Sequence, residues 1–259
     1  MKRVYKSKKE PESLRKYRLS HPEETWEHFR RRIRMGYKDV KKQILQDQHG
    51  LCAYCEISIK LAEDDDEVDD FRVEHFYPKS CTLEHGHNYH LDWRTLLGVC
   101  HGGSQPYVPD AEWRYSTQKR DRSCDVPKGN KEISSQILNP LRIPGKVRLF
   151  RYAEHSGKIF VDESTCPRYL QQKAKRTIRE LNLNAPRLMR MRRMVIQKLE
   201  DDIAMELEQG AQLEDVLTML AETCLVPNYE GISLPFFSVI RWYLGEAAEK
   251  VICNSGNKL

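Results

Sequence analysis

Two cysteines separated by two residues, Cys52-Ala53-Tyr54-Cys55, most restrict what this chain can fold into. Thiolates at this spacing can turn back onto one tetrahedral ion, and such a site usually holds zinc. A redox dithiol is the alternative, but it requires a thioredoxin-like βαβ context that the surrounding sequence lacks. The pair therefore predicts a zinc-stapled fold that needs two further ligands.

The other six cysteines supply candidates for those ligands. The last three fall in the predicted hairpin-to-helix joint and helical tail, where a small buried thiol is the ordinary role. Cys100 and Cys124 are the better pair, with Cys81 or His101 as substitutes.

Composition limits the class of protein. The chain has 259 residues, 31% of them charged, and a mean hydropathy of −0.70. No apolar run approaches the length of a membrane span, and the first residues lack the pattern of a secretory signal. We therefore expect a cytoplasmic protein with no membrane partner, in which eight cysteines serve as metal ligands or core residues more than as disulfides.

The net charge of +5 is unevenly distributed. Residues 1–42 hold 15 Lys or Arg against 6 acids, and residues 168–198 hold 10 against the single acid Glu180. Residues 200–230 hold nine acids and no Lys or Arg. Basic segments favour nucleic-acid binding, although solvated helix faces have the same composition. The acidic segment suggests a second kind of partner.

Periodicity and turn residues predict the elements. Residues 1–19 are basic and aperiodic and suggest an arm, and Ser20 begins a possible capping box. Residues 51–144 are loop-rich, with a short strand at 71–77 and an acidic loop at 63–70. The other expected elements are an amphipathic helix from Trp26 to Gly50 broken near Gly36, a hairpin over 147–161, a helix from Arg168, a long helix with Asn184 as N-cap and Pro186 in its first turn, an acidic helix over 213–220, and the apolar segment PFFSVIRWYL.

The stretch FRVEHFYPKS carries Glu74 and His75 between the two halves of the proposed zinc site. Asp125 and Lys128 follow Cys124 directly, so we expect Glu74, His75 and Asp125 to converge. Histidine suits the deprotonation of water near neutral pH, and carboxylates suit a hard ion such as Mg²⁺. Lys128 or Lys79 could pair with a phosphate. This combination predicts phosphodiester hydrolysis.

An ordered series of motifs strengthens that interpretation. LCAYCE, VEHFYPKS, LDWRTLLGVC and SCDVPKGNKE are followed by RLFRY, SGKIF and the helix containing LMRMRRMV. Over roughly residues 20–200 this series resembles the HNH, or ββα-metal, endonucleases, specifically the PtuB nucleases of Septu and retron-associated anti-phage systems.

The resemblance implies an α+β fold with a small zinc-stapled ββα-metal core surrounded by α-helices. It divides the chain into a basic arm (1–19), a nuclease domain with an N-terminal helix (20–165) and a helical C-terminal region (166–259). It implies His75 as general base and Glu74 and Asp125 as ligands of a catalytic Mg²⁺ or Mn²⁺. Lys128, the candidate phosphate contact, completes the predicted catalytic residues. The implied ligands of a structural Zn²⁺ are Cys52, Cys55, Cys100 and Cys124.

The implied partners are an ATPase of the PtuA type and a nucleic-acid substrate, either phage or host DNA or tRNA. Retron-associated members add a reverse transcriptase and its reverse-transcribed DNA. A zinc-stabilised nucleic-acid-binding adaptor with a decayed site, or a protein-docking module, is the alternative.

One position departs from the family pattern. The central Asn of the HNH motif is Thr95 here, within Trp93-Arg-Thr-Leu-Leu97. That Asn usually fastens the loop carrying the histidine, and a Thr hydroxyl could replace it in part. Nearby His85, His87 and His90 form either a polar loop or a second metal site.

Overall fold

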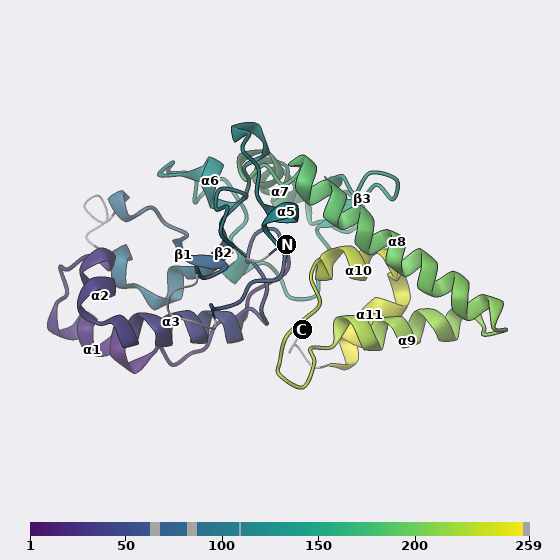
Figure 1. Ribbon diagram of the computed structural model, residues 1–259, viewed down its shortest axis with the longest axis horizontal. Coiled ribbons are helices and arrows are strands. Elements are labelled where there is room, and N and C mark those ends of the chain that lie inside the picture. The colour runs from purple at the N-terminus through teal and green to yellow at the C-terminus, as the bar shows by residue number, and fades with distance from the viewer. Residues whose placement is uncertain (63–67, 82–86, 109, 256–259) are drawn as a thin grey trace.

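The computed structural model describes residues 1–62, 68–81, 87–108 and 110–255. Within them, helices predominate over two small antiparallel sheets, as expected for an α+β fold (Figure 1). None of the helices in these ranges is both long and apolar enough to cross a bilayer. The helices are α1 (Glu12–Ser20), α2 (Trp26–Arg32), α3 (Arg34–Asp47), α5 (Ala111–Arg114), α6 (Asp125–Lys128), α7 (Arg168–Glu180), α8 (Pro186–Glu208), α9 (Leu213–Leu225), α10 (Phe237–Tyr243) and α11 (Gly245–Asn254).

The first sheet pairs β1 (Phe71–His75) with β2 (Leu96–Cys100), and its register joins Glu74 to Leu97 and Phe71 to Cys100. All five residues of β2 are buried, so this strand passes through the core. The second sheet pairs β3 (Phe150–Tyr152) with β4 (Ile159–Val161), which confirms the predicted hairpin.

The first ten residues are packed against the fold rather than extending from it. Met1 and Val4 are buried, and the Met1 ammonium lies 3.0 Å from a carboxylate oxygen of Glu56. Glu56 also accepts hydrogen bonds from the backbone N–H and hydroxyl of Ser238. This buried carboxylate therefore joins three distant parts of the sequence, and α1 occupies the second half of the segment expected to be aperiodic.

Three helix boundaries differ from the sequence-based expectation. Ser20, the expected start of a capping box, is the last residue of α1. Helix α2 is capped by Thr25 instead, whose side chain accepts a hydrogen bond from the His28 N–H at 3.2 Å. The break in the long N-terminal helix falls at Ile33, before Gly36. Asn184 does not cap α8. Its side chain bonds the backbone of Ile159 in β4 at 2.9 and 3.1 Å, which ties the helix to the second sheet.

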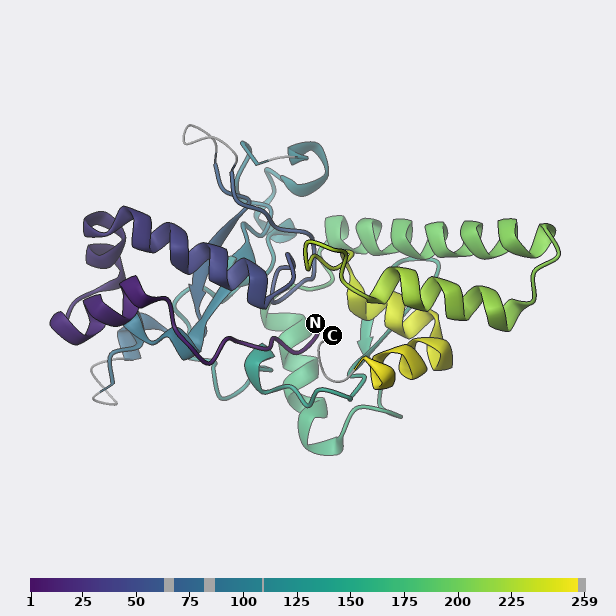
Figure 2. The same cartoon turned by 90° about the horizontal axis from the view of Figure 1, so that it is seen from below.

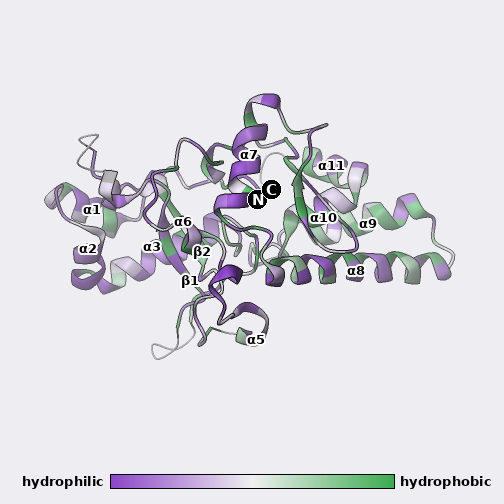
Figure 3. Ribbon diagram, turned by 90° about the horizontal axis from the view of Figure 1, so that it is seen from above, coloured by the Kyte–Doolittle hydropathy of each residue, from purple (hydrophilic) through white to green (hydrophobic). Residues whose placement is uncertain are grey.

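Two hydrophobic cores hold the chain together. The larger core includes both sheets, α1 to α3 and the first half of α8, whereas the smaller one packs the second half of α8 against α9, α10 and α11. Helices α1 to α3 and helices α9 to α11 lie toward opposite ends of the molecule (Figure 2). Helix α7 is largely hydrophilic along its length, while α9 carries more apolar residues (Figure 3).

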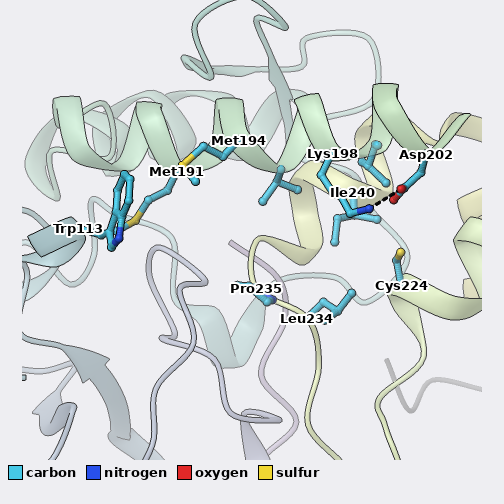
Figure 4. A pocket seen from close by; sticks show the side chains of 11 residues that line it. Trp113, Met191, Met194, Lys198, Asp202, Cys224, Leu234, Pro235 and Ile240 are labelled. Carbon is cyan, nitrogen blue, oxygen red and sulfur yellow. Dashed lines mark hydrogen bonds and ion pairs between the residues drawn. The ribbon is translucent and has the colours of Figure 1, made fainter. Parts of the chain in front are cut away.

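An apolar groove of ≈ 450 Å³ lies along α8, beside α9 and the chain leading into α10 (Figure 4). Trp113 closes one end, and the ion pair of Lys198 with Asp202 borders it (Figure 4). None of its lining residues belongs to β1, β2 or α6, so this groove is separate from the predicted catalytic residues.

Candidate active site

The alternation of side chains along β1 separates the predicted catalytic residues. Arg72 and Glu74 point to one face of the strand, and His75 points to the other. On the first face, Arg72 donates to both oxygens of Asp125, Nε to Oδ2 at 2.6 Å and Nη2 to Oδ1 at 2.8 Å. Lys128 Nζ donates to Glu74 Oε1 at 2.6 Å. The structure thus brings Glu74 and Asp125 together from β1 and α6, but not in one cluster with His75.

Both carboxylates are mostly buried, with side chains 13% and 11% exposed. Burial raises the pKa of Glu74, Lys128 lowers it, and the nearby charge of Asp125 raises it further. Burial likewise raises the pKa of Asp125 against the opposing effect of Arg72. Each carboxylate is therefore matched by one cation, and the two lie close enough to repel each other.

Lys128 is itself buried, with its side chain 1% exposed. Besides Glu74, its ammonium donates to the backbone carbonyl of His75 at 3.2 Å. This differs from the predicted contact between Lys128 and a phosphate, because the ammonium is directed inward and orients the residues of β1. The other predicted phosphate contact, Lys79, donates to Glu27 of α2.

His75 lies on the opposite face beneath α2. Its ring meets the edge of Trp26 at a centroid distance of 5.3 Å, and Nε2 lies 3.1 Å from the carbonyl oxygen of His90. A carbonyl can only accept, so Nε2 carries the hydrogen and Nδ1 keeps its lone pair. Burial lowers the pKa of His75 to about 3, which keeps the ring neutral near pH 7.

The loop that contacts His75 is fastened without the central Asn of the family pattern. The Thr95 hydroxyl donates to the Asp92 carbonyl at 3.0 Å, and the Thr95 carbonyl accepts from the Phe76 N–H at 3.2 Å. The Asp92 carboxylate accepts from the Arg94 N–H and contacts His87. The hydroxyl of Thr95 thus closes its own turn, and a backbone bond joins that turn to the residue after His75.

The structure brings the four predicted cysteines together. Cys52, Cys55, Cys100 and Cys124 are buried, and their sulfurs all lie within 4.8 Å of one another. Three of the separations are 3.5, 3.6 and 3.9 Å. Four sulfurs bound tetrahedrally at about 2.3 Å from zinc would be spaced about 3.8 Å apart, whereas a disulfide needs about 2.05 Å. The cluster therefore has the dimensions of a site that can hold a metal ion such as zinc.

Polar groups around the cluster favour thiolates. The N–H groups of Cys100 and Gly102 donate to sulfur at 3.3 and 3.4 Å, and the hydroxyl of Ser123 donates to Cys124 at 3.6 Å. Hydrogen bonds from the neighbouring cysteines lower the pKa of the Cys100 thiol, whereas burial raises the pKa of Cys55 and Cys124 in the absence of a bound cation. These donors would stabilise negative charge on sulfur.

A buried arginine provides the clearest sign of that charge. Arg187 at the start of α8 is 2% exposed and donates to Ser123 through Nη2, while Nε and Nη1 have no hydrogen-bond partner. Burial lowers the pKa of Arg187, and negative charge on the four cysteines raises it. A guanidinium buried beside neutral thiols would be unfavourable, whereas four thiolates on Zn²⁺ carry a net charge of −2 that it can balance.

The cysteine cluster also fixes the predicted catalytic face. Cys100 ends β2, the partner of β1, and Cys124 directly precedes Asp125. Cys124 has a φ of +61°, and a Cβ at Gly102 would lie 2.1 Å from the Ser123 carbonyl oxygen. Only glycine fits there, so the chain can pass close enough to unite β2 with α6.

The remaining candidates do not join these groups. His101 bonds the Asp69 carbonyl at 2.8 Å rather than the cluster, the placement of the Cys81 side chain is not described, and His85 lies outside the described residues. Within the described ranges, His87 and His90 have separate partners, and the four cysteines are the one group of three or more His, Cys, Asp or Glu side chains placed to hold a metal.

Sequence reasoning missed Arg72, Tyr54 and Arg187. Arg72 could have been found from the strand period of two, since it shares the face of Glu74. Tyr54 lies inside the Cys-x-x-Cys motif and donates to Glu74 at 3.3 Å. No local pattern distinguishes Arg187 from the exposed arginines beside it.

Comparison with known proteins agrees with the motifs. No family model matches the chain. A curated Escherichia coli protein named "Retron Ec83 putative HNH endonuclease" is 32% identical over 209 residues, which cover 76% of this chain and 79% of that protein. The chain therefore belongs to the HNH endonuclease family.

Proposed function

We propose that this protein is a metal-dependent HNH endonuclease that hydrolyses phosphodiester bonds. In this proposal β1, β2 and α6 form the ββα-metal core, and Cys52, Cys55, Cys100 and Cys124 hold a structural Zn²⁺. The observation that carries it is the pairing of Glu74 with Asp125 beside a neutral histidine. A carboxylate of β1, a second carboxylate that faces it from α6 and a histidine at the end of β1 match the needs of phosphate hydrolysis.

Glu74 and Asp125 would hold the catalytic Mg²⁺ or Mn²⁺. A carboxylate has about four acceptor positions, so the bonds from Arg72 and Lys128 leave room for a hard cation. Such an ion stabilises the charge that develops on the phosphate and the leaving oxygen.

His75 would take the proton from the attacking water through Nδ1. The His90 carbonyl holds the ring through Nε2, and Lys128 holds the carbonyl of His75 and the carboxylate of Glu74. A phosphate anion at the end of β1 would raise the proton affinity of the ring as the water is deprotonated. Lys128 is thus a positioning residue, and the substrate must reach the end of β1 to meet both faces.

The relative's name supports a retron setting, and the family resemblance of the motifs suggests the rest. We infer that the protein acts in an anti-phage retron or Septu system with a PtuA-type ATPase, as the effector that cuts DNA or tRNA. The reverse transcriptase and its reverse-transcribed DNA are further expected partners.

One variant tests the catalytic assignment. Purified chain, alone and with its ATPase and ATP, is incubated with plasmid DNA and total tRNA in Mg²⁺ or Mn²⁺. His75→Ala should abolish cleavage while the protein stays folded at the assay temperature, whereas His155→Ala, in the exposed turn before β4, should cut normally. Full cleavage by His75→Ala would exclude it as the base.

A nucleic-acid-binding adaptor without turnover is the second candidate. It is favoured by Thr95 in place of Asn and by the cations that already bind both carboxylates. Binding of nucleic acid by the wild type without cleavage in any divalent metal would support it.

A further inference from the structure

A groove of ≈ 310 Å³ opens beside the candidate active site. Its first wall is Phe76 and Tyr77, the two residues that follow His75. The segment from Ser134 to Ile143 and residues Leu170 and Lys173 of α7 form the rest. Because Phe76 and Tyr77 directly follow His75 in sequence, a ligand in this groove would lie next to the chain segment that carries the proposed general base.

Two cations of the groove have no acidic partner. Arg142 and Lys173 are exposed, and no described carboxylate lies within ion-pair distance of either. The groove has no acidic lining residue. Three other basic residues of α7 are paired: Lys175 lies 2.7 Å from Glu163, and Arg176 and Arg179 lie 3.8 and 3.2 Å from Glu180. The charges of Arg142 and Lys173 line the groove without a carboxylate partner, and such charges suit a phosphate.

The rest of the lining suits a nucleobase. Phe76, Ile137 and Leu138 provide an apolar base, and Tyr77 adds a half-buried aromatic ring that stacks on Tyr89 at 5.0 Å. The hydroxyls of Ser134 and Ser135 and the amide of Asn139 also line the groove. Such polar groups can bond the edges of an exposed base, and aromatic rings bind its face.

We infer that this groove binds one unpaired nucleotide of the strand being cut, with its phosphate on Arg142 and Lys173 and its base against Tyr77. The inference rests on the proposed nuclease function, since it places the nucleotide next to the scissile phosphate. The volume is at the lower end of the range for ligand pockets, which suits one nucleotide, and a base can enter the groove only when it is unpaired. The favoured substrate class is therefore single-stranded nucleic acid or an unpaired loop.

Binding without cleavage tests the groove directly. Fluorescence anisotropy measures the affinity of the full chain, with no divalent metal added, for labelled oligothymidylate, oligouridylate and a duplex of equal length. We expect the single strands to bind more tightly than the duplex. Tyr77→Leu should weaken single-strand binding by roughly 5- to 150-fold, the range for one stacked base.

The charged residues have a separate readout. Replacing Arg142 and Lys173 together by Gln should make the plot of log affinity against log salt shallower by about 1.4, since each phosphate contact on a single strand contributes about 0.7. Lys250→Gln, an exposed lysine on α11, is the matched control and should leave slope and affinity unchanged. The Gln variants should keep the wild-type Tm because Arg142, Lys173 and Lys250 are exposed. Tyr77 packs against the larger core, so binding by Tyr77→Leu is measured well below its own Tm.

Three outcomes would overturn the inference: no single-strand binding by the wild type, unchanged affinity in Tyr77→Leu, or an unchanged salt slope in the double variant. Cleavage in Mg²⁺ is measured separately. Normal cleavage with unaffected groove variants would refute the groove alone, while groove-dependent binding without any cleavage would refute the nuclease proposal alone.

Discussion

Replacing Arg187 by methionine should reveal the charge of the cysteine cluster through the sign of the stability change. If the four thiols are protonated, the variant removes an unpaired buried cation and should be more stable than the wild type. If they are thiolates on Zn²⁺, the variant leaves a buried net charge of −2 without its balancing cation and should be less stable.

The structure gives the size of the effect. Arg187 has one hydrogen bond, to Ser123, and its Nε and Nη1 are without partners among the protein's oxygen and nitrogen atoms. Unpaired buried donors cost about 1–3 kcal/mol each, and loss of one partner from a buried ion pair costs about 3–5 kcal/mol. We therefore expect Arg187→Met to lower the free energy of unfolding of the zinc-loaded protein by about 3 kcal/mol or more.

Metal affinity provides a second measurement. Loss of a group that supports the metal ligands typically weakens metal binding by about 10- to 100-fold. Competition with a chromophoric zinc chelator should show a weakening of this size for Arg187→Met and a smaller one for Arg187→Lys, which keeps the charge. Arg190→Met, an exposed arginine on the same helix, should release zinc like the wild type.

The reasoning is refuted if Arg187→Met binds zinc as tightly as Arg190→Met. It is also refuted if the zinc-loaded Arg187→Met protein is more stable than the wild type. Either result would mean that the guanidinium does not balance a thiolate cluster.

Three further predictions follow, two on stability and one on zinc content. Lys128→Met should lower the free energy of unfolding by roughly 3–5 kcal/mol, because Glu74 stays buried without its cation, and Glu74→Gln in the same chain should recover part of the loss in urea unfolding. Burial lowers the pKa of Lys6 to about 7, so above pH 7 the unfolded chain holds more protons than the folded one and stability rises with pH. Relative to Lys6→Met, the wild type should gain at most about 1.4 kcal/mol of unfolding free energy per pH unit up to about pH 10. A difference between the two proteins that stays constant with pH would contradict this. Gly102→Ala should release bound zinc because its Cβ would meet a carbonyl oxygen at 2.1 Å, whereas Gly210→Ala has a positive φ in open space and should keep zinc; equal zinc content in both would refute the steric argument.

Local sequence predicted the elements whose signals are local. The β3–β4 hairpin follows from apolar residues around Ser156-Gly157, and α8 begins at Pro186 because proline suits the first turn of a helix. The Cys-x-x-Cys spacing and the elimination of the cysteines in the helical tail left Cys100 and Cys124 as the better pair, with Cys81 or His101 still open, and the family resemblance implied the full set of four. These features depend on residues near one another or on the chemistry of one ion.

Tertiary packing decided what the sequence could not. The basic segment 168–198 suggested one solvated face, yet Arg187 and Arg192 are buried, the latter bonded to the carbonyls of Leu183 and Leu188. Nothing in the alternation of charges separates these two from their exposed neighbours. Lys128 likewise turns inward because an acid on a distant strand lies above it, a contact that spans 54 positions of sequence.

The pair Glu74-His75 shows how adjacency in sequence can mislead. Neighbouring residues of a strand point apart, so the acid that accompanies Glu74 is Asp125, and the cysteine cluster is what brings it there. Cys100 fixes the end of β2 and Cys124 fixes the start of α6, so an ion shared by these sulfurs would set the distance between the two carboxylates. Removing zinc should therefore separate Glu74 from Asp125 while the distant helices α9 to α11, which belong to the second core, keep their packing.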